Sequence, residues 1–256
     1  MVAAMIMLAY GLNRFMEIPA RVVELQLPGL FLNFEINDKI LTAFLVAGLA
    51  AAGTDWLLHD HPAVQKQNLL PHLLLPSVTA LVIGVPLNQL TFSTNWWLGL
   101  LSGTAAMVIV VVAEYIAVDA DDVRQPLAAA VLSAVAYATF LVLAVTLRAA
   151  GIRLLFLLPA LIIATWLVSL RVLNLRLHGL WTVYESAIVA LVVVQLAAAA
   201  HYWPLAPVRY GLLLLGPAYA LTGLFSGLIE EKQPRSLWVA PAIVLGITWL
   251  GAVLFP

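Results

Sequence analysis

The chain has 256 residues, of which 64% are hydrophobic and 10% are charged, and its formal net charge at pH 7 is -1. A soluble domain carries about 25% charged residues, so this composition excludes a water-soluble globular fold. The near-zero charge argues against a nucleic-acid partner, and the absence of cysteine excludes disulfides and thiolate chemistry.

The chain begins with an apolar segment, residues 1–16, which has neither a basic region before it nor a signal-peptidase motif. We expect a first transmembrane helix here. The segment is short for a span of about 20 residues, so a helix lying in the membrane interface is the alternative.

The next segment, Arg21–Asn37, alternates apolar and polar residues on both sides of Pro28-Gly29. This period of two around a turn dipeptide predicts a small amphipathic β-hairpin outside the membrane, serving as a lid or a docking surface. An irregular interfacial loop is the alternative.

From residue 40 to residue 255 the chain consists of long apolar runs joined by short connections. Each run has the length of a helix that crosses the roughly 30 Å hydrocarbon core. We therefore predict an all-α polytopic membrane bundle of eight or nine helices, forming a single domain over residues 1–256 with an eight-helix core over residues 40–255. The predicted spans of that core are Ile40–Leu58, Pro71–Leu90, Trp96–Val118, Leu127–Leu147, Leu154–Leu170, Leu180–Ala200, Val208–Ile229 and Leu237–Phe255.

The loops alternate between two faces. Face A carries the loops near residues 59–70, 119–126, 171–179 and 230–236, and face B carries the hairpin and the remaining loops. Without the hairpin segment, basic residues favour face A, which predicts that face A is cytoplasmic. All acids beyond Lys39 also fall at face A: Asp55, Asp60, Glu114, Asp119, Asp121, Asp122, Glu185, Glu230 and Glu231.

The densest polar cluster contains Asp55, His59 and His61, and His72 begins the next span on the same face. Asp55 and His59 are four residues apart and share one side of a helix. Imidazole and carboxylate groups could hold a divalent metal or pass protons. A hydrated interface with local pairing explains the same residues without any cofactor, and we expect none.

Three acids lie inside predicted spans, namely Asp55 near the end of its span, Glu114 and Glu185, and all three are candidates for an embedded polar site. An ionisable group inside a membrane costs roughly 2.5–3.5 kcal/mol at the bilayer centre and so faces protein or water. Glu114 and Glu185 are candidates for ion or proton coupling, for substrate binding, or for structural pairing with Arg171 or Arg176.

The sequence contains no G-x-S-x-G, Walker A or dinucleotide-binding glycine motif. Three classes of function remain. The favoured one is a non-catalytic accessory or scaffold subunit of the cell membrane, most typical of a prokaryotic inner membrane, whose partners are the lipid bilayer and other membrane subunits. The second is a small secondary transporter that uses Glu114 and Glu185. The third is a lipid-modifying metalloenzyme with a site at Asp55, His59, His61 and His72.

Overall fold

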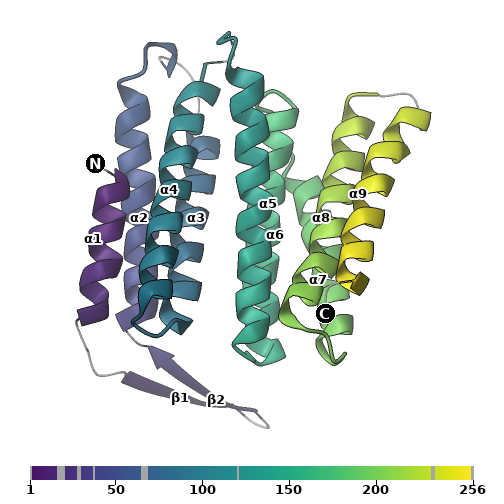
Figure 1. The fold of residues 1–256 in the computed structure, drawn as a ribbon. Coiled ribbons are helices and arrows are strands. Elements are labelled where there is room, and N and C mark those ends of the chain that lie inside the picture. Colours follow the sequence, from purple (N-terminus) through teal and green to yellow (C-terminus); the bar gives the residue numbers. More distant parts are fainter. Residues whose placement is uncertain are drawn as a thin grey trace.

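The computed structural model describes residues 2–15, 21–27, 30–36, 38–64, 69–119, 121–231 and 234–254. Eight of its helices are long and apolar enough to cross a membrane, and a shorter apolar helix precedes them (Figure 1). The helices are α1 Val2–Phe15, α2 Asp38–His59, α3 Leu70–Gln89, α4 Thr94–Ala117, α5 Gln125–Ala149, α6 Leu154–Arg176, α7 Val183–His201, α8 Pro207–Ile229 and α9 Pro234–Leu254, with a 3-10 turn at Pro62–Val64.

Two strands lie between α1 and α2, beyond the face B end of the helices (Figure 1). Strands β1 (Arg21–Leu27) and β2 (Leu30–Ile36) pair antiparallel, with Arg21 opposite Ile36. The Pro28-Gly29 turn and the strands' side-chain environment lie outside the described residues.

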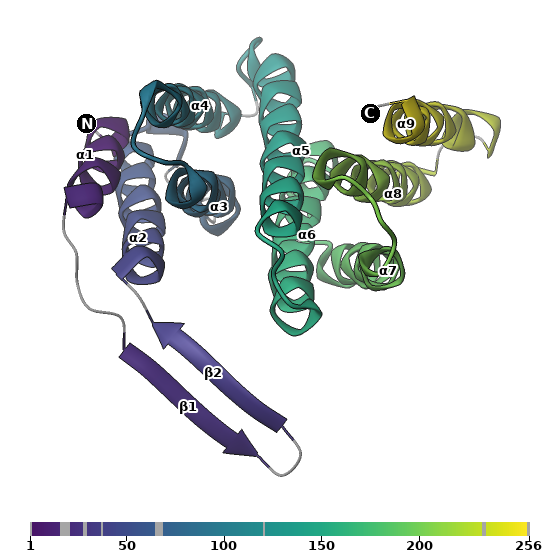
Figure 2. The ribbon, with the colours of Figure 1, turned by 60° about the horizontal axis from the view of Figure 1, so that its bottom comes forward.

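The helices form two groups, α1–α4 and α5–α9, which Figure 2 shows side by side. Within each group, consecutive helices pack on one another, and the groups meet where α3 and α4 contact α5 and α6. We call this contact the junction. A smaller core that includes Ile6, Val46 and Met107 fills the first group. The larger core fills the second group and extends across the junction to Leu75 and Val110.

Polar contacts cross the junction near both membrane faces. Near face B, Gln89 Nε2 on α3 donates to the carbonyl of Thr146 on α5 at 3.1 Å. Near face A, Arg171 on α6 pairs with Glu114 on α4. In a bilayer, interhelical polar contacts of this kind hold helices together, because lipid supplies no hydrophobic force between them.

The predicted spans agree with the helices to within a few residues, with one informative difference. The sixth predicted span ends at Leu170, whereas helix α6 continues to Arg176. The two arginines that interrupt the apolar run are therefore helical residues rather than loop residues.

Candidate functional site

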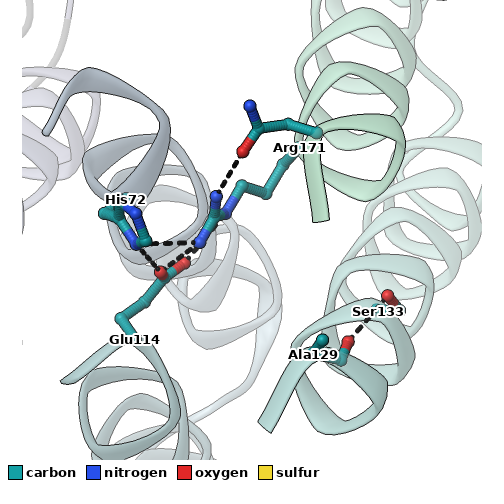
Figure 3. A network of polar contacts seen from close by, with 6 residues as sticks. His72, Glu114, Ala129, Ser133 and Arg171 are labelled. Carbon is teal, nitrogen blue, oxygen red and sulfur yellow. Dashed lines mark hydrogen bonds and ion pairs between the residues drawn. The ribbon is translucent and has the colours of Figure 1, made fainter. Parts of the chain in front are cut away.

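A buried ion pair crosses the junction near face A. Glu114 on α4 is 0% exposed and Arg171 on α6 is 1% exposed. Arg171 Nε donates to Glu114 Oε1 at 3.1 Å, and Nη2 donates to Oε2 (Figure 3). This two-pronged geometry is the strongest arrangement available to an arginine and a carboxylate.

Two further residues complete the network. Nδ1 of His72, on α3, lies 2.8 Å from Glu114 Oε2 and 3.1 Å from Arg171 Nη2. On α6, Asn174 accepts a hydrogen bond from Arg171 Nη1 at 2.9 Å and donates to the carbonyl of Leu180 at 3.3 Å. Three helices from both groups therefore meet at one carboxylate, and the network fixes α6 against α3 and α4.

The network borders a cavity of about 390 Å³ that we call the outer cavity. Its walls come from α3, α4, α5, α6 and the connection after α6, and none of the described residues lining it carries a carboxylate. Its polar lining residues are His72, Gln125, Arg171, Asn174, His178 and Trp181. The outer cavity can therefore hold a polar group against imidazole, amide and guanidinium donors.

A second cavity of about 370 Å³, the inner cavity, lies in the same junction between α3, α4 and α5. Thr79 lines it, seven residues beyond His72 along α3, which is about 10 Å toward face B. Most other lining residues are apolar, including Val82, Leu87 and Val135. The buried Thr79 hydroxyl has no hydrogen-bond partner among the described residues, so it is available to form a hydrogen bond with a ligand in the cavity.

The cluster predicted at Asp55, His59 and His61 does not assemble around one point. His59 Nδ1 lies 3.5 Å from Asp55 Oδ2 on its own helix, α2, and both side chains are exposed. The His61 ring instead packs edge-on against Tyr115, with 4.6 Å between centroids. His72 belongs to the Glu114 network. Among the described residues, no group of three or more His, Asp or Glu side chains is arranged to hold a metal ion, and a metal at these histidines stays a prediction.

Glu185 lies in the first turn of α7, which begins at Val183 rather than at Leu180 as predicted. Glu185 therefore lies two residues inside the helix rather than five, and it remains within the candidate membrane span Val183–His201. Glu185 is half-buried, and it does not line the outer or the inner cavity. Glu114 and Glu185 consequently do not share a site.

In the acidic loop after α4, Asp122 accepts hydrogen bonds from Arg124, from the backbone N–H at 2.8 Å and from the guanidinium. These bonds, the backbone one first, hold the pKa of Asp122 below its usual range. This loop carries a locally satisfied charge pair next to the outer cavity.

The sequence offered Arg171 or Arg176 as a partner for Glu114, and the structure pairs Glu114 with Arg171. His72 was instead assigned to the cluster around Asp55, and neither Asn174 nor Gln125 was named. One signal was available. Arg171 and Asn174 are three residues apart within Leu170–Leu175, and this spacing puts both on one side of a helix if the helix continues.

The helices and the buried site define a multi-pass membrane protein. The chain belongs to the family described as "Protein of unknown function (DUF5656)", whose model matches residues 18–255. Neither the curated proteins nor the solved structures contain a significant match to the chain.

Proposed function

We propose that the protein is a small permease and that its solute path runs through the junction. One observation carries the proposal: two cavities lie in the contact between the helix groups, with the His72–Glu114–Arg171 network beside the one nearer face A. The outer cavity receives the solute, and the ion pair is the gate that separates it from the inner cavity.

The charges support a gate. An ion pair joining two helix groups can hold one arrangement closed and let another form when it breaks, as in transporters where one bundle rocks against the other. Prolines inside the flanking helices, Pro76 and Pro86 in α3 and Pro159 in α6, interrupt backbone hydrogen bonding and provide places to bend.

The cavity linings indicate the solute class. The outer cavity offers polar donors, whereas the inner cavity is mostly apolar with a few hydroxyls such as that of Thr79. A small amphipathic molecule, with a polar end and an apolar body, satisfies both linings in turn.

The chain contains no cysteine, so a single introduced cysteine is the only thiol in the protein. We would place one at Thr79 in the inner cavity and one at Ala117 in the outer cavity. The control is Ala80→Cys, on the same helix as Thr79 but fully buried in the smaller core. A charged, membrane-impermeant methanethiosulfonate would be added from face A to sealed proteoliposomes.

We expect Ala117→Cys to react in every background and Ala80→Cys in none. Thr79→Cys should react slowly, and about tenfold faster after Glu114→Gln, which corresponds to a change of roughly 1.4 kcal/mol in the gate equilibrium. If Thr79→Cys stays unreactive with and without Glu114, the ion pair is a fixed structural tie and the permease proposal fails.

The accessory role predicted from the sequence is the second candidate, and α9 favours it. This edge helix packs chiefly on α8 and exposes large apolar side chains, including Trp238, Ile247 and Val253. A partner helix could cover that surface as well as lipid does. Photocrosslinking from position 247 in native membranes should then yield one discrete protein adduct, whereas lipid adducts alone would count against an accessory role.

A further inference from the structure

A second arginine of α6 lines a different cavity, away from the junction. Arg176 borders a space of about 410 Å³ between α5, α6 and α8, which we call the Arg176 cavity. Its walls are mostly small residues of α5 and two tyrosines: Ala129, Ala130, Ser133, Ala134, Tyr137 and Tyr219.

The Arg176 guanidinium reaches across from α6 to α8. Its carbon lies 5.3 Å from the centre of the Tyr219 ring. A methyl group placed on Gly223 of α8 would lie 3.5 Å from Arg176 Nη1. The side chain is thus held by an aromatic face and a glycine, and neither neutralises its charge.

Within the described part of the chain, Arg176 has no carboxylate partner and no hydrogen bond, and no acid lines its cavity. The Tyr137 hydroxyl is bonded to Thr222, and the Ser133 hydroxyl donates to the carbonyl of Ala129 at 2.8 Å (Figure 3). Among the described residues, the Arg176 guanidinium and the Tyr219 hydroxyl therefore remain as donors of the cavity without a hydrogen-bond partner. A cation at the end of a membrane span can reach the headgroup layer, where anionic lipids attract basic side chains.

We propose that the Arg176 cavity binds the phosphate of an anionic phospholipid. Arg176 is the last residue of a membrane-spanning helix, the level at which headgroups lie. Ala130 and Ala134 are exposed one turn apart on the cavity wall of α5, so the cavity opens along an apolar helix face. The phosphate pairs with the guanidinium, and the acyl chain follows the small residues of α5.

The test is native mass spectrometry of the detergent-purified full chain titrated with phosphatidylglycerol. Arg176→Gln removes the cation, and Ala134→Leu fills the cavity without changing any charge. The matched control is Arg124→Gln, which removes a cation at the same face from an exposed side chain. Arg176→Lys keeps the positive charge. Binding that survives in this variant shows that the loss in Arg176→Gln comes from the missing cation and not from misfolding.

We expect Arg176→Gln and Ala134→Leu each to weaken phosphatidylglycerol binding by at least about tenfold, the scale of a lost charge-assisted bond. Arg124→Gln should stay within about twofold of the unmodified chain, and Arg176→Lys should bind better than Arg176→Gln. Equal lipid binding by Arg176→Gln and Arg124→Gln would overturn the proposal. Thermal stabilisation by inorganic phosphate through Arg176, with no lipid retained, would overturn the lipid assignment in favour of a soluble anion.

The Arg176 cavity lies outside the junction, so the result of the lipid titration is independent of the result of the thiol-labelling experiment.

Discussion

The two arginines near the face A end of α6 are five residues apart and have opposite environments. Arg171 is buried, and Glu114, His72 and Asn174 surround its guanidinium. Arg176 lies against Tyr219 in an open cavity and has no carboxylate partner among the described residues. One helix end thus presents one cation to the other helix group and another to the surroundings.

The difference shows how a membrane protein can use the same residue type for two purposes. A buried charge needs a partner of good geometry, because removing two ions from water costs several kcal/mol per ion before their attraction repays it. An arginine that is only partly buried stays solvated and can bind an anion that is not part of the protein. We therefore interpret Arg171 as part of the protein's own mechanism and Arg176 as a site for a ligand.

The largest expected effect comes from breaking the buried pair. Glu114→Ala leaves Arg171 unpaired and should destabilise the protein by about 3–5 kcal/mol, the usual cost of orphaning a buried charge. Reversible unfolding by SDS in mixed micelles, followed by tryptophan fluorescence, measures it. The double variant Glu114→Leu/Arg171→Met should recover most of the loss. A single-variant cost below about 1 kcal/mol would show that the pair is not tightly buried.

His72 should matter less than Glu114. Nδ1 of its ring lies near both Glu114 and Arg171, but this one nitrogen either donates to Glu114 or accepts from Arg171, and the side chain is partly exposed. His72→Ala should therefore cost about 1 kcal/mol, the net value of a typical hydrogen bond. The same unfolding assay applies. A cost equal to that of Glu114→Ala would mean that His72 holds the junction on its own.

Arg176→Gln should have a still smaller effect in lipid-free micelles. Only the contact with the Tyr219 ring is lost, which is worth roughly 0.5–1 kcal/mol at exposed sites. Arg171→Gln, measured in parallel, should cost several times more. If the two variants lost the same free energy of unfolding, Arg171 and Arg176 would not differ in their structural role.

The smallest effect is expected at the exposed pair of α2. His59→Ala removes a contact with Asp55 four residues earlier, and such helix-surface pairs contribute about 0.2–0.5 kcal/mol. Unfolding of His59→Ala beside Asp55→Asn measures it. A loss above about 1 kcal/mol in either variant would point to a role beyond local pairing, such as the predicted metal site.

The sequence predicted the spans well because hydropathy and span length are local properties. It ended the sixth span at Leu170 because a charged residue in an apolar run normally marks a loop. That inference fails at Arg171, since the partner that makes burial tolerable, Glu114, is 57 residues earlier on another helix. Hydropathy cannot choose between Arg171 and Arg176 as the partner of Glu114, and the arrangement of the helices at the junction pairs it with Arg171.

The candidate site shows the same limit. Asp55 and His59 were grouped correctly because their spacing places them on one helix face, and they pair. His61 and His72 were grouped with them from shared membrane face alone. Residues at the same membrane face lie at a similar depth, but the sequence does not tell which of them are neighbours in the membrane plane. In the structure His72 contacts Glu114 of α4 and Arg171 of α6, whereas His61 packs against Tyr115.

The central claim is that the Glu114–Arg171 pair holds the two helix groups together at face A. Electron–electron double resonance tests it directly, with spin labels on His59→Cys of α2 and Tyr184→Cys of α7, two exposed positions in different groups of a cysteine-free chain. We expect one narrow distance distribution in the otherwise unmodified protein and a second, longer population after Glu114→Gln. An identical distribution in both proteins would contradict the claim.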